Sequence, residues 1–337
     1  MSIKLRILKI LRQFHWFRWY EYNLLNKQKR KELMTHYHST DNGTHSFCKE
    51  IVCLFGKHFE TGGLADRLRG IVSVYQICKA NEIPFKICWT QPFPLERFLE
   101  PNKVLWNMDG KDICWDVPPT EVISAEITEE SAWQERKIRR EIEKCIRARH
   151  CQQLHIYTNM RLAYEDGTFP TLFRELFKPS MEIENALSSE LHNIGGGEYI
   201  AVQCRFVGIL GDFKDITSDL LSEGEKTELM GRLISAIEEI HNDYPVPVKI
   251  LLCTDSPTFR SKACDTLSYI YAVRGDIEHI DYSANPESNA YMKLFLDLFL
   301  MSKAKKIYRV ASERMRFSGL PYMASLLEGK QLIDIKI

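Results

Sequence analysis

The feature that most constrains the fold is an alternation of short apolar runs with longer segments of helical period. The run EIVCLF, at residues 50–55, has the length of a buried strand. Residues 64–79 repeat apolar side chains at i, i+4, i+7, i+8 and i+11, the period of a helix with one buried face. The run PFKICWT follows at residues 84–90. A strand, a helix and a strand at this spacing predict a parallel crossover unit.

The alternation returns in the second half of the chain. Ser222 and Glu225 have the spacing of a capping box, which predicts the start of a helix. Residues 319–329 predict a closing helix. Strands are predicted at residues 199–206, 248–256 and 305–312.

A glycine-rich run, NIGGGEY at residues 193–199, separates the two halves and predicts a domain boundary. Because an α/β unit of similar size lies on each side, we predict an α/β fold of two Rossmann-like domains that face a cleft. The predicted parts are an N-terminal helix and linker at 1–46 and two α/β domains at 47–195 and 196–337. Ligands of such sheets bind outside the carboxyl ends of the strands, so residues just after each strand are candidates.

The N-terminal stretch MSIKLRILKILRQFHWFRW predicts a basic amphipathic helix. It lacks the long apolar region and small-residue cleavage site of a secretory signal. Two interpretations stay open: the helix lies in an anionic membrane interface, or it packs on the protein itself or on a partner. The apolar residues on one helical face are Ile3, Ile7, Ile10, Leu11, Phe14 and Phe17. The positive charges are Lys4, Arg6, Lys9, Arg12 and Arg18.

Composition narrows the class of protein. Basic and acidic residues are equal at 45 each, so no net charge favours a nucleic acid as partner. No stretch reaches about 18 uninterrupted apolar residues, the length that a membrane span needs. Four cysteines, Cys53, Cys88, Cys204 and Cys253, lie in predicted strands, and no Cys-x-x-Cys pair occurs. This pattern favours a reducing, cytoplasmic compartment.

The stretch TGGLADRLRG, at residues 61–70, follows the first predicted strand. Gly62 and Gly63 allow a tight turn and the close approach of a ligand to the backbone. The helix that follows offers free N–H groups to an anion, and Asp66 and Arg67 add charged groups. The alternative is an ordinary strand-to-helix turn with arginines on the surface.

Polar residues also follow two strands of the second half. Arg205 ends an apolar strand, where a buried cation is costly unless it meets an anion, and a guanidinium group suits a phosphate. The alternative is an ion pair with Asp212 or Asp215 in the next loop. Asp255 and Ser256 end another predicted strand, where they either line a site or cap the next helix.

Two further places in the second half carry candidates. Asp297 is the only charged residue in the apolar run 294–301, so it needs a partner: a nucleoside base, a ribose or a nearby arginine. Residues 310–319 join a predicted strand to a predicted helix, as a phosphate cradle or as a capped surface loop. Their candidates are Ser312, Arg314, Arg316 and Ser318.

Several common chemistries leave no pattern in this sequence. It has no Walker A motif, no Gly-x-Ser-x-Gly elbow and no group of histidines with metal-ligand spacing. No Asp-x-Asp pair is present to hold a divalent ion over a diphosphate. We therefore expect no metal cofactor.

Three segments resemble the fucosyltransferase superfamily that includes bacterial α-1,2-, α-1,6- and protein O-fucosyltransferases. GGLADRLRGI resembles its glycine-rich N-terminal motif. DLFLMSKAKKIYRVASERMRFSGLPYMASLL, at residues 297–327, resembles its C-terminal stretch. AVQCRFVG falls where the family has a His-x-Arg-Arg-x-Asp signature.

The resemblance implies the GT-B arrangement, with an acceptor domain in the first half, a GDP-fucose donor bound in the second, and inverting transfer without a metal. By position, Arg205 contacts the donor diphosphate and Asp297 lies near the guanosine. Asp66, the carboxylate of the 61–70 stretch, is a candidate base for the acceptor proton. The residues implied near the sugar and the acceptor are Gly62, Gly63, Asp66 and Arg67. The residues implied near the phosphates are Ser312, Phe317 and Ser318, with Arg314 and Arg316 as further cations.

The chain departs from the family signature at three positions, where Gln203, Phe206 and Gly208 replace the histidine, the second arginine and the aspartate. An alternative is therefore a GT-B-like protein that binds a nucleotide or glycan without catalysis. A Rossmann enzyme with an adenine cofactor is disfavoured, because no Gly-x-Gly-x-x-Gly follows the first strand. The leading hypothesis is a transferase of fucose or a related sugar in surface polysaccharide biosynthesis. The acceptor of this transferase is then a glycan or lipid-linked glycan. The protein itself is then cytoplasmic and peripheral on the inner membrane face.

Overall fold

The computed structural model describes residues 11, 13–40, 48–56, 62–125, 132–148, 151–162, 165–196, 198–212, 220–275, 280 and 289–337. The chain forms two compact units. The first comprises Met1–Gly62, Asp66–Gln91 and Leu105–Tyr164, and the second Gly63–Ala65, Pro92–Val104 and Glu165–Ile337. Residues 165–195 thus group with the second unit, and the three domain ranges drawn from the sequence stay predictions.

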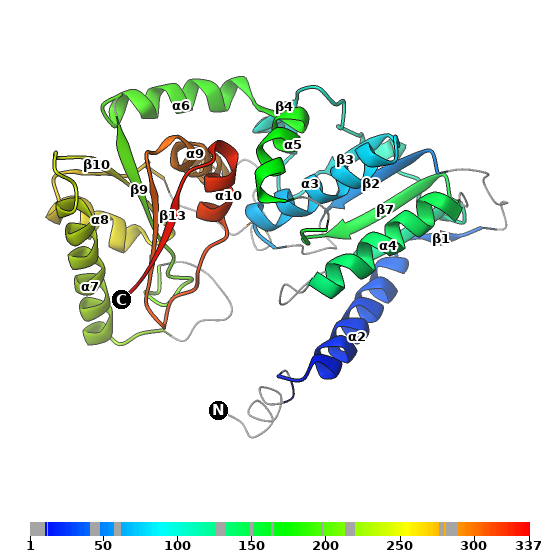
Figure 1. Ribbon diagram of the computed structural model, residues 1–337, viewed down its shortest axis with the longest axis horizontal. Coiled ribbons are helices and arrows are strands. Elements are labelled where there is room, and N and C mark those ends of the chain that lie inside the picture. The colour runs from blue at the N-terminus through cyan, green and yellow to red at the C-terminus, as the bar shows by residue number, and fades with distance from the viewer. Residues whose placement is uncertain are drawn as a thin grey trace. The chain divides into compact units, whose positions relative to one another are not determined.

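A four-stranded parallel sheet forms the first unit. Its strands are β2 (Glu50–Phe55), β3 (Phe85–Trp89), β6 (Thr120–Ala125) and β7 (Gln153–Thr158). Their order is β3-β2-β7-β6. The crossover helices are α3 (Leu64–Ala80) and α4 (Ala132–Ala148), both visible in Figure 1. The strands are buried almost throughout, as a parallel sheet covered on both faces requires.

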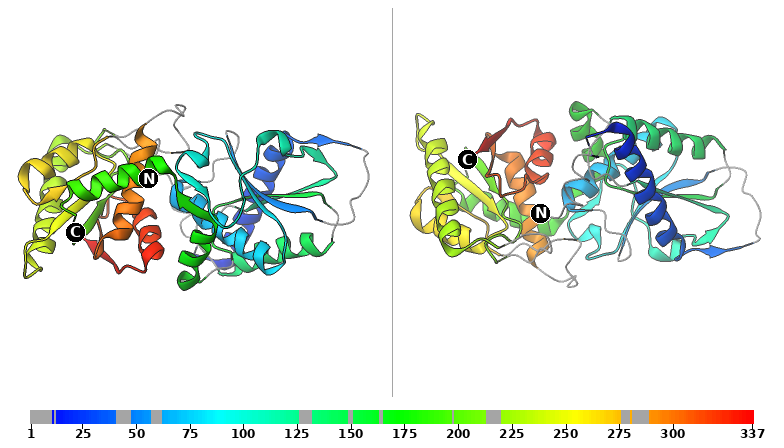
Figure 2. Two further views of the ribbon diagram at one scale, coloured as in Figure 1. Left: turned by 90° about the horizontal axis from the view of Figure 1, so that it is seen from above. Right: turned by 90° about the horizontal axis from the view of Figure 1, so that it is seen from below.

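The helix α2 (His15–Met34) packs against β6, at the edge of this sheet, and crosses the unit in the right-hand view of Figure 2. Tyr22 is buried and meets Trp133 of α4 edge to face, with ring centroids 5.8 Å apart. Leu33 joins an apolar cluster on the sheet. Half of the predicted apolar face, Ile3, Ile7 and Ile10, lies outside the described residues, so the membrane role of this helix stays a prediction.

A five-stranded parallel sheet forms the second unit. Its strands are β9 (Tyr199–Cys204), β10 (Lys249–Thr254), β11 (Ile270–Tyr271), β12 (Ile307–Ala311) and β13 (Leu332–Lys336). Their order is β11-β10-β9-β12-β13. Figure 1 shows helices on both sides of the sheet, as right-handed crossovers require. On one side lie α7 (Glu223–Asn242) and α8 (Pro257–Thr266), and on the other α9 (Asn289–Lys303) and α10 (Leu320–Glu328).

Shorter elements complete both units. Those of the first are β1 (His38–Ser39), η2 (Gly110–Asp112) and β5 (Asp116–Val117). Those of the second are η1 (Leu95–Arg97), β4 (Leu99–Pro101), η3 (Asp166–Thr168), α5 (Phe169–Leu176), β8 (Phe177–Pro179) and α6 (Met181–Asn193). β1 pairs in parallel with β5, and β4 pairs antiparallel with β8. Phe98 stacks on Phe295 of α9 at 4.6 Å, which ties the segment before β4 into the second core.

The alternation of strands and helices predicted from the sequence is confirmed in both units. The ends of β2, β3, β9, β10 and β12 fall within two residues of their predicted positions. The capping box is confirmed as well: Ser222 Oγ accepts from the Glu225 N–H at 3.4 Å, and Glu225 Oε2 accepts from the Ser222 N–H at 2.8 Å. The fold class is therefore α/β with two Rossmann-like units.

Candidate functional site

Four residues predicted from the sequence lie at one edge of the second unit's sheet. The strands β10, β9 and β12 are parallel neighbours, so their carboxyl ends share an edge. Arg205 follows β9, Asp255 and Ser256 follow β10, and Ser312 follows β12. Ligands of open α/β sheets bind at this edge. The fold thus brings these four side chains to one candidate site.

Asp255 fixes the backbone turn that follows Arg205. Its carboxylate oxygens accept hydrogen bonds from the N–H groups of Phe206, at 2.8 Å, and Val207, at 2.9 Å. Val207 has a φ of 52°, a left-handed conformation that is strained for a β-branched residue. Burial raises the pKa of Asp255, and both N–H groups and the nearby Arg205 charge oppose that rise. Asp255 therefore holds the strained turn and positions Arg205.

Ser256 and Asp212 cap α8. Ser256 Oγ accepts from the Phe259 N–H at 3.0 Å, so the capping alternative is confirmed for this residue. Asp212 Oδ2 accepts from Ser256 Oγ at 2.6 Å and from the Thr258 N–H at 2.9 Å. The ion pair of Arg205 with Asp212, one alternative from the sequence, is therefore not formed. Asp215, the other candidate, lies outside the described residues.

Arg205 and Ser312 carry polar atoms that the described protein leaves unsatisfied. Arg205 is half-buried, and within the described part of the chain its guanidinium group forms no hydrogen bond and no ion pair. The buried Ser312 hydroxyl likewise has no hydrogen-bond partner among the described residues. The buried Ser312 hydroxyl is costly unless a ligand satisfies it. The half-exposed Arg205 guanidinium group is accessible to an anion with several acceptor oxygens.

A hollow of about 300 Å³ lies beside Ser312 and is lined by both signs of charge. Arg314 Nη1 lies 3.8 Å from Glu225 Oε1, and both side chains are more than half exposed. A carboxylate thus offsets Arg314 in this structure. Arg316 is exposed and does not line the hollow. The predicted contacts of both arginines with a phosphate stay predictions.

Phe317 and Ser318 lie against Arg309 of β12. The guanidinium carbon of Arg309 is 4.5 Å from the Phe317 ring centroid, and its Nη1 donates to the Ser318 carbonyl at 2.8 Å. Asp334 of β13 accepts two further hydrogen bonds of 2.7 Å from Arg309. Ser318 Oγ accepts from the Leu320 N–H at 3.2 Å, at the start of α10. Arg309 therefore fixes the end of this loop, a role that the sequence did not indicate.

Asp297 lies in α9, where its partner is Lys293. Lys293 Nζ and Asp297 Oδ2 are 2.6 Å apart, and the two side chains are 2% and 1% exposed. The arginine weighed as a partner is therefore replaced by a lysine one helical turn away. The i, i+4 spacing of Lys293 and Asp297 is a sequence signal that could have identified this ion pair. A contact of Asp297 with a guanosine stays a prediction.

Charged residues hold the glycine-rich loop of the first unit. Gly62 has a φ of 83°, and an added Cβ would lie 2.8 Å from Asp66 Oδ2, so this position requires glycine. Arg67 Nε donates to the Gly62 carbonyl at 3.0 Å, and Nη1 donates to the Gln91 carbonyl at 3.3 Å. The guanidinium group also lies over the Trp89 ring at 4.7 Å. Arg67 thus organises the loop from within.

The predicted residues of this loop differ in how far their side chains are exposed to solvent. Arg67 is buried, with 3% of the residue exposed, so its protein contacts occupy the group predicted to bind the sugar. The Asp66 side chain is 40% exposed and lies 2.9 Å from Arg69. An added Cβ at Gly63 would meet no described atom within 4 Å, so a close approach does not explain this glycine. Contacts of these residues with a sugar or acceptor stay predictions.

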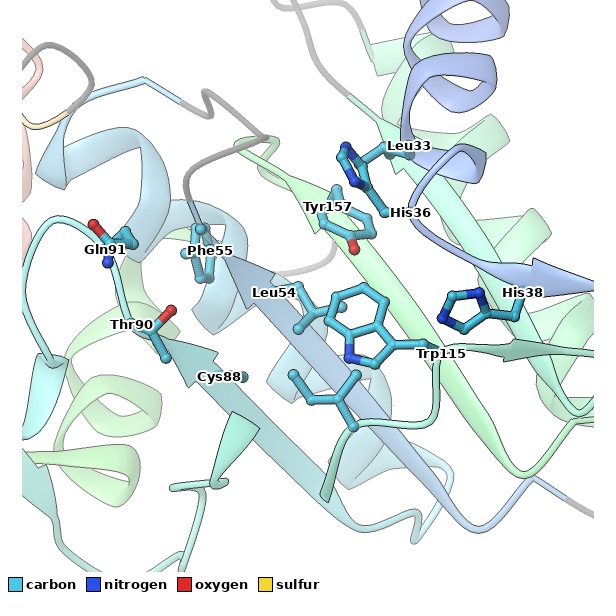
Figure 3. Close-up of a pocket in the computed structure, with 12 residues that line it drawn as sticks. Leu33, His36, His38, Leu54, Phe55, Cys88, Thr90, Gln91, Trp115 and Tyr157 are labelled. Carbon is cyan, nitrogen blue, oxygen red and sulfur yellow. The ribbon is translucent and has the colours of Figure 1, made fainter. Parts of the chain in front are cut away.

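A pocket of about 400 Å³ in the first unit was not found from the sequence. It lies at the carboxyl ends of β2, β3 and β7. Figure 3 shows His36 and His38 on one side, Thr90 and Gln91 on the other, and the Trp115 ring between them. The histidines reach it because the two-residue strand β1 pairs with β5, next to Trp115. Strands of two residues carry no periodic signal, which explains why the sequence did not reveal this pocket.

Among the described residues, no group of three or more histidine, cysteine, aspartate or glutamate side chains has the geometry of a metal site. None of the helices within the described ranges has the length and apolar character needed to cross a membrane.

No protein-family model and no curated protein sequence matches this chain. Solved structures do match it. NodZ α-1,6-fucosyltransferase soaked with GDP-fucose superposes with a TM-score of 0.55 at 17% identity, over 83% of this chain and 93% of that one. NodZ from Bradyrhizobium gives the same TM-score and identity.

Two further solved structures extend the similarity. A mutant of Arabidopsis thaliana FUT1 in complex with GDP has a TM-score of 0.54 at 12% identity, over 91% of this chain and 74% of that one. POFUT1 in complex with GDP has a TM-score of 0.50 at 10% identity, over 86% and 99%. The chain therefore has the GT-B fold of these fucosyltransferases, which confirms the fold that the resemblance implied.

Proposed function

We propose that the protein is a glycosyltransferase that moves fucose, or a related sugar, from a GDP-sugar to a hydroxyl group of a glycan acceptor. The similarity to NodZ, FUT1 and POFUT1 supports this reaction class, since the matching structures of all three were obtained with GDP or GDP-fucose. The observation that carries the proposal is that Arg205 and Ser312, both at the carboxyl edge of the second sheet, have no side-chain partner among the described residues. A diphosphate supplies acceptor oxygens for both groups.

In the proposed reaction, an acceptor hydroxyl attacks the anomeric carbon from the face opposite the diphosphate. A new C–O bond forms there, the bond to the phosphate oxygen breaks, and GDP leaves with the electron pair, which inverts the configuration. Arg205 stabilises the charge that grows on the diphosphate, without a metal. Its removal is expected to cost about 2.7–4 kcal/mol of barrier, by analogy with oxyanion donors. Arg314 and Arg316 are the additional cations proposed to bind the diphosphate.

Asp66 is the base that we propose for the acceptor proton. Its carboxylate is accessible, and Arg69 Nη2 orients it through a 2.9 Å contact. Arg69 is held in turn, because its Nε donates to the Asn159 carbonyl at 2.9 Å. This second contact anchors the pair on the end of β7.

We further propose an acceptor from surface polysaccharide assembly, free or lipid-linked, and a location in the cytoplasm at the inner membrane face. Three apolar side chains of α2 support a membrane surface as the location. Trp16, Tyr20 and Leu24, each four residues apart, are 62%, 54% and 52% exposed. Tryptophan and tyrosine suit a membrane interface, where one end of the ring is apolar and the other is wet.

The experiment that tests the proposal measures GDP release when the purified protein is incubated with GDP-fucose and a panel of other nucleotide sugars. We expect release from a GDP-sugar, and its loss in Arg205→Ala. Arg147→Ala is the matched control, because the Arg147 side chain is 73% exposed and lies on α4. Equal release by wild type and Arg205→Ala would refute the role of Arg205.

The rival is a GT-B-like protein that binds a nucleotide or a glycan without catalysis. Phe206 favours it, because this buried residue stands at the second arginine of the family signature. The rival predicts that GDP raises the melting temperature while no nucleotide sugar releases GDP. The two measurements together separate an enzyme from a binding protein.

A further inference from the structure

The pocket beside Trp115 in the first unit has an apolar floor and a polar rim. Leu54, Cys88 and Tyr157 are buried in its floor. The rim side chains His36, His38, Thr90 and Gln91 are all exposed. Figure 3 shows the rim groups on opposite sides of the Trp115 ring. A ligand that fits this pocket has an apolar face and hydrogen-bonding edges.

The charge of the lining residues further narrows the chemical class of ligand. Among its described lining residues there is no aspartate, glutamate, lysine or arginine. Its polar lining side chains are those of histidine, threonine and glutamine, which can hydrogen-bond to an uncharged ligand. The volume of about 400 Å³ accommodates a sugar ring.

A hydrogen-bonded group behind the floor fixes the shape of the pocket. Tyr37 Oη lies 2.7 Å from His155 Nδ1 and 2.9 Å from Tyr157 Oη. His155 Nε2 lies 2.9 Å from Gln153 Oε1. The Tyr37 and Trp115 rings are 5.2 Å apart. The aromatic wall is thus held in place before any ligand arrives, which lowers the entropy cost of binding.

The Arg67 side chain connects the pocket wall to the glycine-rich loop. Phe55 and Gln91 line the pocket. The guanidinium group of Arg67 lies 5.7 Å from the Phe55 ring centroid and donates to the Gln91 carbonyl at 3.3 Å. The same group donates from Nε to the Gly62 carbonyl. A ligand in the pocket therefore lies one side chain away from the loop that carries Asp66.

We propose that this pocket binds an uncharged sugar ring of the acceptor, with its C–H face on Trp115 and its hydroxyl groups at the rim. The assignment rests on the proposed function, since it names the substrate class of the acceptor side. A sugar ring has the required apolar face and polar edge, and aromatic faces suit it. Trp115 and His38 are then binding residues, and Arg67 positions the pocket wall.

The test uses saturation-transfer NMR with methyl β-glucoside, methyl β-galactoside and methyl N-acetyl-β-glucosaminide as probes, on the full chain with GDP present. We expect at least one methyl glycoside to bind, and Trp115→Ala to weaken its binding about tenfold, the loss of one aromatic contact. Gly56→Phe is the second variant, because an added Cβ at Gly56 meets no described atom within 4 Å. A phenylalanine ring at this pocket-lining position should occupy space in the pocket, so we expect glycoside binding to be lost while the melting temperature is kept.

The matched control is Trp16→Ala, an exposed tryptophan that does not line the pocket. It should bind the glycosides as wild type does. Glycoside binding that survives both Trp115→Ala and Gly56→Phe overturns the pocket proposal, and so does binding of 1-octanol with no binding of any glycoside. Failure of the donor function is seen separately, because GDP then neither binds nor is released, whatever the glycosides do.

Discussion

Lys293 and Asp297 form a fully buried ion pair across one turn of α9, with Nζ and Oδ2 2.6 Å apart. Burial raises the pKa of Asp297, while the charge and the hydrogen bond of Lys293 oppose that rise. A pair buried this deeply is stable only as a unit, because either charge alone would be left without water or partner.

Replacing one member of this pair should therefore be worse than replacing both. We expect Lys293→Met to lower the free energy of unfolding by about 3–5 kcal/mol, since it leaves the Asp297 carboxylate uncompensated. The double variant Lys293→Met/Asp297→Leu should recover most of that loss. Urea denaturation measures the free energy of unfolding of wild type, of the single variant and of the double variant. Lys305→Met, which removes the exposed pair with Glu198, is the control and should change stability little. A double variant less stable than Lys293→Met would contradict this account.

Gly70 is a second position where substitution should lower the free energy of unfolding, here because of close backbone packing. An added Cβ would lie 2.3 Å from the Thr158 carbonyl oxygen, so α3 packs on the end of β7 only with glycine there. We expect Gly70→Ala to lower the free energy of unfolding by about 1–3 kcal/mol. Gly231→Ala makes the same change in α7 at an exposed position with no described atom within 4 Å. It should raise stability by about 0.5–1 kcal/mol. Equal effects of the two substitutions in urea would disprove the close packing.

His155 should make stability depend on pH. Burial lowers the pKa of His155 from its ordinary value of 6.5 to about 3. The folded state therefore keeps the ring neutral while the unfolded state takes up a proton. The stabilising contribution is complete above pH 6.5 and is lost as pH falls toward 3, at about 1.4 kcal/mol per pH unit.

The measurement is the free energy of unfolding at pH 7.5 and pH 5, in wild type and His155→Gln. Wild type should lose about 2 kcal/mol more than the variant over this range, because only wild type carries the depressed pKa. His192→Gln, which changes an exposed histidine of α6, should follow wild type. Parallel curves for wild type and His155→Gln would show that the His155 pKa is not lowered.

The three exposed apolar side chains of α2, Trp16, Tyr20 and Leu24, should decide whether the protein associates with a membrane. We expect wild type to co-sediment with vesicles of phosphatidylcholine and phosphatidylglycerol, and less with phosphatidylcholine alone, because the helix region is basic. Trp16→Ser/Tyr20→Ser/Leu24→Ser should reduce the bound fraction several-fold, since it removes the apolar surface. Met181→Ser, at an exposed apolar residue of α6, is the control. Undiminished binding by the triple variant would retire α2 as the contact.

The sequence was informative wherever one local pattern decides the structure. Buried strands such as β2 and β9 are continuous apolar runs, and the Ser222 capping box is a contact within four residues of chain. Both depend on neighbours in sequence, so both were predicted. Arg205 and Ser312 were found as candidates because each directly follows a predicted strand. The strand order that brings both to one edge of the sheet comes from the structure.

What the sequence left open depends on contacts between distant residues. Asp255 was weighed as a cap of its own helix, yet it binds the turn after β9, 48 and 49 residues away. Arg67 was predicted to face a ligand, yet its guanidinium group holds Gly62 and Gln91. The Trp115 pocket needs a two-residue pairing of β1 with β5. No local propensity encodes these choices.

The central claim is that Arg205 binds the diphosphate of a guanosine nucleotide, and titration calorimetry with GDP tests it most directly. The account predicts that wild type and Arg147→Ala bind GDP with equal affinity, and that Arg205→Ala binds it about 100-fold more weakly or not at all. Absence of GDP binding by wild type, or unchanged affinity in a folded Arg205→Ala variant, would contradict it.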